Sequence, residues 1–265
     1  MHGLAAMAAG AGVALVPGTV RAEFEIPQVN AEAGTIEAEY RGATHDGILL
    51  AEPGEERNLE QSHELEFQLA PSDWWMYRIT PGLSQPQGGD LDYNDFVLET
   101  QFVLLRRPPE GLGIAFMLGY TLHFGNLKDE PDEFEYGPIV EYATGPWLLT
   151  LNPLLTQESG ENSEGLHGFE YAAQLQYRFA KHWAIAALAF GEIEDLTDSG
   201  PFDDQIHRAG PTLYLLLGEE EFDDFALEES EGRPESAWKI GLGALFGLTP
   251  ATTDLSLKAM VALEY

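Results

Sequence analysis

Long runs of strictly alternating residues are the feature that most limits what this chain can fold into. Large apolar residues alternate with small or polar ones through residues 111–124, 169–179, 238–248 and 255–265. Successive side chains of a β-strand point to opposite faces, so each run predicts a strand with one apolar face. A strand of a soluble sandwich usually has about 5 to 6 residues, whereas a tilted membrane-spanning strand needs about 9 to 11. The length of these runs therefore favours a membrane-spanning barrel.

Turn signals divide the rest of the chain into further candidate strands. The resulting even number suits a single-chain barrel with both chain ends on one side of the membrane. We therefore predict an all-β fold, a transmembrane antiparallel up-and-down β-barrel of about 12 strands, over residues 34–265. A periplasmic N-terminal segment at residues 23–33 precedes it. The predicted strands are residues 34–41, 60–70, 73–82, 93–105, 112–124, 134–143, 146–157, 167–179, 182–193, 206–217, 237–248 and 254–265.

The gaps between the predicted strands are asymmetric. Those that follow odd-numbered strands are mostly long and polar, and those that follow even-numbered strands are mostly tight. Outer-membrane barrels have long extracellular loops and short periplasmic turns, so this asymmetry places both chain ends in the periplasm. The acidic segment at residues 219–236 breaks the pattern, because it falls where a short turn belongs. We interpret it as a solvated insertion.

The first residues of the chain have the composition of a secretory signal peptide. An apolar stretch of small residues at 3–16 is followed by Pro17 and Gly18 and by a small-residue cleavage site that ends at Ala22. This predicts a signal peptide over residues 1–22 and export of the mature chain. The alternative is an apolar N-terminal helix of a soluble domain. The stretch is preceded by no Lys or Arg, which leaves the true translation start open.

The tryptophans lie at the beginnings of predicted odd-numbered strands, which share one rim of an antiparallel barrel. Aromatic side chains gather at the headgroup level of a membrane, so this placement predicts a periplasmic aromatic girdle. An alternating C-terminal strand with an aromatic end resembles the assembly signal of bacterial outer-membrane barrels. We therefore expect the barrel-assembly machinery to bind it. The girdle residues are Trp74, Trp75, Trp147, Trp183, Trp238 and Tyr265.

The charge of the chain is strongly negative. Its 45 acidic and 13 basic residues give a formal charge of −32. This charge argues against nucleic acid as a partner and favours the attraction of cations. A secreted acidic protein from a high-salt habitat is an alternative explanation of the same charge. The chain has no cysteine, which excludes disulfides and thiolate chemistry.

If the apolar faces point to lipid, the opposite faces line the lumen, and these faces are rich in carboxylates. Rings of Asp and Glu in a confined channel select for cations, which favours a cation-biased conduit. The alternative is that these side chains satisfy one another and a few arginines inside a plugged barrel. The predicted lumen-lining residues are Glu37, Glu39, Glu64, Glu66, Glu99, Gln101, Glu135, Glu141, Glu170, Gln174, Gln176, Arg178 and Arg208.

No spacing of residues points to catalysis. None of the seven histidines belongs to a recognisable catalytic pattern, and the chain has neither a phosphate loop nor a His-Glu-x-x-His motif. We therefore nominate no catalytic residue and expect no cofactor. The acidic loop at residues 192–207 could bind Ca²⁺ through oxygen ligands, but its spacing resembles no EF-hand, and a solvated loop is the competing interpretation. The metal candidates are Asp195, Asp198, Asp203, Asp204 and His207.

Four short segments carry a resemblance to known proteins. They are FGEIEDL at 190–196, SGPFDDQIHRAGP at 199–211, LFGLT at 245–249 and LAPSDWW at 69–75. Together they resemble a family of largely uncharacterised proteobacterial outer-membrane proteins, whose members are described only as outer-membrane proteins or transporters. The resemblance covers most of the mature chain and implies a barrel fold and an outer-membrane location rather than an activity. The acidic segment at 219–236 departs from the family.

We interpret the chain as a channel or transporter of the bacterial outer membrane for small solutes, with a bias toward cations. The expected partners are outer-membrane lipid, the barrel-assembly machinery and the permeating solutes or cations, with no nucleic acid. Two alternatives stay open, namely an enzyme that acts on outer-membrane lipid and a structural or adhesive surface protein. The channel is favoured over the enzyme because no catalytic site is nominated. The solute, the oligomeric state and whether the lumen is plugged are left open.

Overall fold

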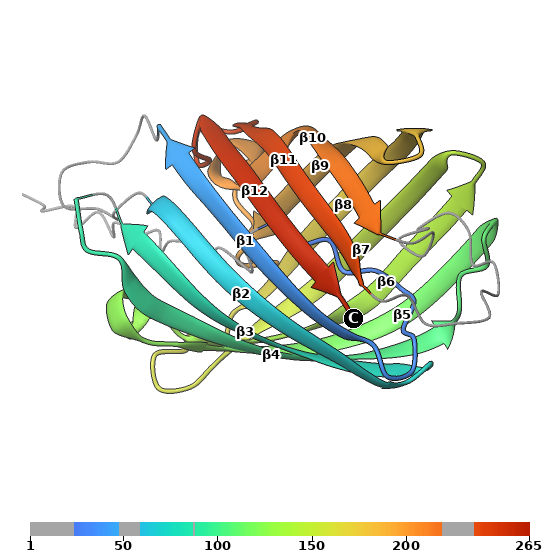
Figure 1. Ribbon diagram of the computed structural model, residues 1–265. Coiled ribbons are helices and arrows are strands. Elements are labelled where there is room, and N and C mark those ends of the chain that lie inside the picture. The colour runs from blue at the N-terminus through green and yellow to red at the C-terminus, as the bar shows by residue number, and fades with distance from the viewer. Residues whose placement is uncertain (1–23, 48–58, 87, 219–235) are drawn as a thin grey trace, which may run out of the picture.

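Antiparallel strands close into a single barrel. The computed structural model describes residues 24–47, 59–86, 88–218 and 236–265. Within them, twelve strands pair in chain order, and β1 pairs with β12 to close the sheet (Figure 1). The predicted all-β, up-and-down barrel is therefore confirmed.

Each predicted strand overlaps an observed one. The largest difference is at the first strand, which continues past Arg41 to Asp46. The backbone stays extended there because it pairs with β2 on one side and with β12 on the other, which satisfies its peptide groups. The strands are β1 Ile36–Asp46, β2 Leu59–Ser72, β3 Trp75–Pro86, β4 Asp92–Leu105, β5 Gly111–His123, β6 Asp132–Thr144, β7 Trp147–Ser159, β8 His167–Ala180, β9 Trp183–Ile193, β10 Ile206–Gly218, β11 Ala237–Gly247 and β12 Leu255–Glu264.

The strands place large apolar side chains outward and polar or small side chains inward. In β5, Ala115 and Met117 are fully buried inside the barrel, whereas Leu112 on the other face is 42% exposed. The same alternation of buried and exposed residues follows β8 and β12. An apolar band around a closed barrel with a polar interior is the pattern of a membrane-spanning barrel. The predicted facing of the alternating segments is confirmed.

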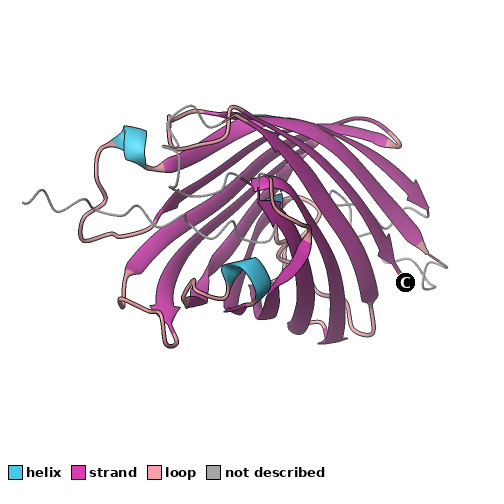
Figure 2. Ribbon diagram, turned by 90° about the vertical axis from the view of Figure 1, so that its left-hand side faces the viewer, coloured by secondary structure: helices cyan, strands magenta, loops and turns pink. Residues whose placement is uncertain are grey.

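The two ends of the barrel differ in their connections. Short turns at residues 73–74, 145–146 and 181–182 lie at one end, which we call the turn rim. Longer loops, such as those at residues 124–131 and 194–205, lie at the other end, the loop rim. The short 3₁₀ helices η2 (Gly125–Leu127) and η3 (Phe202–Asp204) belong to these loops (Figure 2). Among the described residues, no helix is long and apolar enough to cross a membrane.

The tryptophans gather at the turn rim. Trp75, Trp147 and Trp183 begin β3, β7 and β9, and Trp238 is the second residue of β11. Because odd-numbered strands run in the same direction, all four side chains start from the rim at which β12 ends beside Tyr265. Trp74 lies in the turn before β3, at the same rim. The structure thus assembles the predicted girdle residues on one rim.

Two predicted segments fall outside the part of the chain that the structure describes. The signal peptide at residues 1–22 is one of them. The acidic segment at 219–236 is the other, apart from Ser236. Both interpretations stay predictions.

Residues 24–33, which we call the strap, lie against the inner wall of the barrel. Before β1 the chain reverses at the turn rim, where the Gly34 N–H donates to the Ala70 carbonyl at 2.7 Å, and the strap enters the lumen (Figure 1). Phe24, Val29 and Ala31 are at most 5% exposed and pack on inward-facing side chains. The structure differs here from the expectation of a periplasmic segment. The reason is that the inner wall offers apolar partners for these side chains and hydrogen-bond donors for the strap carbonyls.

Candidate functional site

The inner wall carries the polar side chains that the sequence predicts to line the lumen. Glu37 and Glu39 are half-buried and border a cavity beside the strap. Arg178 instead lies near the turn rim, where its Nη2 donates to the carbonyl of Lys181 at 2.7 Å. The other predicted residues are buried in the interior, namely Glu64, Glu66, Glu99, Gln101, Glu135, Glu141, Glu170, Gln174, Gln176 and Arg208.

Arg41 joins carboxylates from two neighbouring strands. Its Nη1 donates to Glu39 at 3.0 Å and to Glu66 at 2.9 Å, and its Nε donates to Glu64 at 3.1 Å. Glu39 and Glu66 stand directly opposite each other in the β1–β2 ladder, where two like charges repel. Arg41 is 2% exposed, so its charge is buried together with its partners. The guanidinium therefore compensates the repulsion between Glu39 and Glu66, which would otherwise destabilise this part of the barrel wall.

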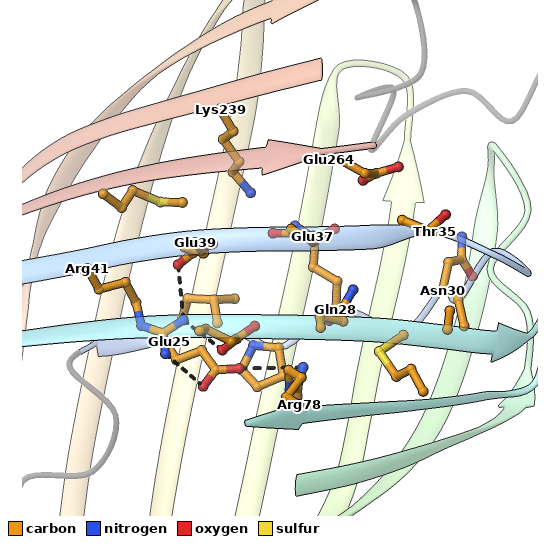
Figure 3. Close-up of a pocket in the computed structure, with 18 of the residues that line it drawn as sticks. Glu25, Gln28, Asn30, Thr35, Glu37, Glu39, Arg41, Arg78, Lys239 and Glu264 are labelled. Atoms are coloured by element: carbon orange, nitrogen blue, oxygen red, sulfur yellow. Dashed lines mark hydrogen bonds and ion pairs between the residues drawn. The ribbon is translucent and has the colours of Figure 1, made fainter. Parts of the chain in front are cut away.

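A second guanidinium continues this network. Arg78 on β3 donates from Nε to Glu99 at 3.0 Å. Glu25 of the strap lies between the two arginines, 3.6 Å from Arg41 Nη2 and 3.5 Å from Arg78 Nη1 (Figure 3). These contacts are longer than those between the arginines and the wall carboxylates. Glu25 therefore adds its charge to a network that the strands already build.

Arg107 attaches the strap close to the turn rim. It lies in the turn after β4, and its Nε donates to Glu141 at 2.9 Å. Its backbone N–H donates to Asn30 Oδ1 at 2.9 Å, and its carbonyl accepts from Asn30 Nδ2 at 3.2 Å. A Cβ at Gly113 would lie 2.9 Å from the Cα of Arg107, closer than real Cβ atoms approach. Glycine at this position therefore lets the turn fold into the lumen.

Polar side chains of the wall donate to the backbone of the strap. Buried carbonyl groups must be hydrogen-bonded, so these donors determine where the strap backbone lies. The donors come from three separate parts of the wall, on β4, β7 and β12. The pairs are Gln101 Nε2 to Gln28 O at 2.7 Å and to Val29 O at 3.1 Å, Asn152 Nδ2 to Pro27 O at 3.0 Å, and Lys258 Nζ to Phe24 O at 3.0 Å.

Phe24 is held by aromatic and cationic groups. Its ring centroid lies 5.3 Å from that of Phe190, and the ring lies 5.1 Å from the guanidinium carbon of Arg208 and 5.8 Å from Lys258 Nζ. Its φ is +59°, a backbone conformation that bulky residues rarely adopt. Such strain costs about 1 to 3 kcal/mol and persists only where the surroundings impose it. The contacts around the ring supply that constraint.

The strap lies between two cavities. Residues such as Glu37 and Lys239 line the first, an empty space of about 1210 Å³ that continues into solvent. Residues such as Glu192 line the second, a space of about 560 Å³ that also reaches solvent. Among the described residues, only Phe24 and Glu25 line both. These two side chains therefore occupy the junction between the cavities.

The lumen holds more basic side chains than the sequence pattern predicted. Arg178 and Arg208 were the only basic residues among the predicted lumen-lining residues. Alternation could have found all but one of the others, because they lie on the inward face of predicted strands. The exception is Arg107, which lies in a turn, where alternation assigns no face. The excess of negative charge in the lumen is thus smaller than expected. The additional basic residues are Arg41, Arg78, Arg107, Lys239 and Lys258.

A second group of carboxylates lies on the wall formed by β6 to β9. Glu133, Glu135 and Glu170 have carboxylate oxygens that all lie within 4.8 Å of one another. Glu170 also stands directly opposite Glu192 in the β8–β9 ladder. Arg208 lines the same cavity as Glu170 and Glu192 and adds positive charge beside them. The sequence nominated Glu135 and Glu170, but only the strand register brings them to Glu133 and Glu192.

Carboxyl groups of the loop rim continue this acidic region. Burial and the nearby charges of Glu158 and Glu130 together raise the pKa of Glu194 from 4.5 to about 7. Burial also raises the pKa of Glu130. Hydrogen bonds from Thr197, in contrast, hold the pKa of Asp195 below its ordinary value. Glu194 is therefore partly protonated near neutral pH, which lowers the negative charge at this rim.

The metal candidates of the loop at 192–207 are not brought together. The carboxylate of Asp195 accepts from the backbone N–H and the hydroxyl of Thr197 at 2.8 and 2.7 Å, and the other three aspartates are exposed. His207 is stacked under Phe202, with ring centroids 4.7 Å apart, and its Nδ1 lies 3.1 Å from the Tyr171 hydroxyl. The turn at Thr197 therefore engages the carboxylate of Asp195, and Phe202 and Tyr171 engage the ring of His207, so neither group is placed to bind a shared metal ion. Among the described residues, the carboxylates close enough to share an ion are Glu25, Glu66 and Glu99, and Glu133, Glu135 and Glu170.

One histidine contacts serines, a pairing that the sequence analysis did not nominate. His45 Nδ1 lies 2.9 Å from Ser256 Oγ, and its Nε2 lies 3.4 Å from Ser62 Oγ. The three side chains come from β1, β12 and β2, so no local spacing reveals them. Ser256 is 1% exposed and Ser62 is 6% exposed, which buries both hydroxyls within the wall. The arrangement links the strands at the closure of the barrel.

The fold and the lumen together define a class of protein. A closed antiparallel barrel with an apolar exterior, a polar interior and aromatic residues at its rim is the architecture of bacterial outer-membrane barrels. The chain combines all of these features. It is therefore a transmembrane β-barrel of the outer-membrane type.

Comparison with known proteins shows likeness in shape alone. No protein-family model matches the sequence, and no curated protein matches it significantly. The chain is similar to the KdgM porin in complex with disordered oligogalacturonate, with a TM-score of 0.48 and 9% identity over 86% of this chain and 98% of that one. It is also similar to the outer membrane protein Omp33 of Acinetobacter baumannii (TM-score 0.40, 6% identity, 89% and 98% covered) and to LpxR from Salmonella typhimurium (0.40, 9%, 86% and 99%).

Proposed function

We propose that the protein lies in a bacterial outer membrane and lets small solutes diffuse through its lumen, with a preference for cations. The observation that supports this function most is a polar lumen with a cavity on each side of the strap. Channels conduct when polar side chains replace part of the water around a solute without binding it tightly. The polar and charged residues around both cavities suit that task.

The proposed cation preference rests on the carboxylates of the lumen. Arg41 and Arg78 neutralise much of the charge on β1 to β4. We therefore assign most of the preference to the carboxylates that line the second cavity, namely Glu25, Glu170 and Glu192. Charges act over a Debye length of about 10 Å at 0.1 M salt, so the preference should grow in dilute salt.

The proposed setting places the turn rim in the periplasm and the loop rim outside the cell. Short turns face the periplasm in barrels of this type, and aromatic residues mark the interface. Outer-membrane lipid then surrounds the apolar band. The end of β12 is accessible to the barrel-assembly machinery, since Tyr265 is 75% exposed.

Recording from the purified protein in a planar bilayer tests this function. Heat-modifiable migration on a denaturing gel first verifies that the barrel is folded. Under a salt gradient, the reversal potential should have the sign of cation preference and should grow as the salt is diluted. A folded barrel without conductance would overturn the channel, and a reversal potential of the opposite sign would overturn the cation preference.

A further inference from the structure

The junction between the two cavities consists of two neighbouring strap residues. Phe24 and Glu25 line both spaces, and no other described residue does. A solute that passes directly between the two adjoining cavities would therefore pass these side chains. We propose that Phe24 and Glu25 form the constriction of the channel, in which Phe24 limits solute size and Glu25 favours cations. This inference rests on the proposed channel function.

The strap is held firmly enough to act as a fixed part of the wall. Val29 is completely buried in an apolar pocket that includes Met117 and Ile139. Donors on β4, β7 and β12 satisfy strap carbonyls on both sides of Glu25. A segment with such anchors at several points keeps its side chains in place, so the constriction has a defined shape.

Phe24 has the properties of a size-limiting residue. Its ring is packed beside Phe190 and between the positive groups of Arg208 and Lys258. Its backbone is held in a left-handed conformation that a bulky residue avoids when unconstrained. The ring therefore has one position, and a smaller side chain at residue 24 should widen the passage.

Glu25 has the properties of a selectivity residue. The charged groups around it are Glu39 and Arg41 of β1, Glu64 and Glu66 of β2, Arg78 of β3 and Glu99 of β4. The arginines make their shorter bonds to the wall carboxylates, at 2.9 to 3.1 Å, and lie 3.5 to 3.6 Å from Glu25. Carboxylates therefore outnumber basic groups at the junction, even when Arg208 and Lys258 beside Phe24 are counted. A cation that enters from either cavity meets this negative charge.

Three substitutions in the full-length protein separate size from charge. Phe24→Ala should raise single-channel conductance and admit larger solutes in a liposome-swelling assay. Glu25→Gln preserves shape and should shift the reversal potential toward zero. Glu32→Gln is the matched control, because it removes one negative charge from the same strap at an exposed position that borders the first cavity but not the junction. It should leave the reversal potential closer to that of the parent protein.

A cross-link tests whether the constriction is fixed. Because the chain has no cysteine, Val29→Cys with Ile139→Cys introduces a single cysteine pair inside one apolar cluster. The cross-linked protein should conduct as well as its reduced form. Loss of conductance on oxidation, with recovery on reduction, would show that the strap must move and would overturn the fixed constriction.

The outcomes distinguish this inference from the proposed function. If the parent protein conducts and neither Phe24→Ala nor Glu25→Gln changes conductance or reversal potential, the constriction is overturned and the channel stands. If the folded parent is silent and only Phe24→Ala conducts, Phe24 blocks the lumen instead of limiting the size of a permeating solute, and both the channel function and the constriction are overturned. If every folded variant is silent, the channel function fails, and the constriction fails with it.

Discussion

Two of the glutamate pairs that stand directly opposite each other across the ladders of this barrel differ in their surroundings. Glu39 on β1 and Glu66 on β2 both accept from the same nitrogen of Arg41, at 3.0 and 2.9 Å. Glu170 on β8 and Glu192 on β9 face each other beside the second cavity. Both pairs border a cavity, but the first pair also shares a buried guanidinium. The comparison teaches that a guanidinium bonded to two opposed carboxylates can make a like-charge contact part of the framework, even where that contact borders a cavity.

The largest expected effect comes from removing the cation of the first pair. Arg41→Leu leaves the carboxylates of Glu39, Glu64 and Glu66 buried without their bridge, and should lower the free energy of unfolding by about 3 to 5 kcal/mol. Urea unfolding in detergent, followed by heat-modifiable migration, measures the loss. Arg208→Gln is the companion variant on the second wall and should cost less, because Arg208 is more exposed than Arg41, at 7% against 2%, and the amide of Gln keeps a hydrogen-bond donor that Leu lacks. An equal or greater cost for Arg208→Gln would remove the distinction between the walls.

The next largest effect comes from placing a charge on the lipid-facing side of β5, which tests the assignment of inward and outward faces. Strand β5 lies between the two acidic groups, since a Cβ at Gly119 would lie 3.5 Å from Glu99 Cγ and 3.6 Å from Glu135 Cβ. Leu118 points the other way, so Leu118→Arg should place a charge in lipid at a cost of about 2 to 4 kcal/mol. Gly119→Ser is the control and should be tolerated. Membrane insertion and urea midpoints measure both, and equal tolerance of the two variants would contradict the facing.

A smaller effect should differ in sign between the two glutamate pairs. Glu192→Gln removes the repulsion with Glu170 and should raise the free energy of unfolding by about 0.2 to 1 kcal/mol. Glu66→Gln removes the negative charge from an acceptor of Arg41 and should lower that free energy. The same urea titration compares them. A loss of stability in both variants would mean that the second pair is as much a part of the framework as the first.

The smallest effect concerns pH and the loop rim above the second wall. The pKa of Glu194 is raised from 4.5 to about 7, so the folded state binds this proton more tightly than the unfolded state. Its contribution to stability is therefore complete below about pH 4.5 and is lost as the pH rises through about 7. Urea midpoints measured across this range should fall with pH, and Glu194→Gln should flatten the decline.

Asp195 provides the control for that pH dependence. Hydrogen bonds from Thr197 lower its pKa below 3.8, so its contribution is present above that pH and is lost as the pH falls through the lowered value. Asp195→Asn should therefore leave the change between about pH 4.5 and 7 intact. If Asp195→Asn flattens the decline as much as Glu194→Gln does, the assignment of the pH dependence to Glu194 is wrong.

The barrel itself could be predicted from short stretches of sequence. The alternation in residues 111–124 and 169–179 indicates both the strands and their lipid-facing sides, because the two faces of a strand repeat every second residue whatever the rest of the chain does. The number of strands, the asymmetry of loops and turns and the common rim of the tryptophans follow from the same local pattern. Even the inward position of Glu135 and Glu170 required no knowledge of their partners.

The strap could not be predicted in this way. Residues 24–33 alternate only in short pieces interrupted at Pro27, too short for a membrane-spanning strand, and the donors that hold them are distant in sequence, since Gln101 is 73 residues from Gln28 and Asn152 is 125 residues from Pro27. Such contacts exist only after the barrel has closed around the strap. The contacts of His45 with Ser256 and Ser62 could not be predicted either, because the three residues come from three different strands.

The two glutamate pairs show where local information ends. Alternation places Glu39, Glu66 and Arg41 on inward faces, but it does not say which residue of β2 stands opposite which residue of β1. That choice is the strand register, and a shift of one residue would turn each inward side chain of a strand toward lipid. Closure of the barrel satisfies the ladders on both sides of every strand at once, and so selects one register. The tertiary structure thereby decided that Arg41 joins one pair of glutamates and that both pairs border a cavity.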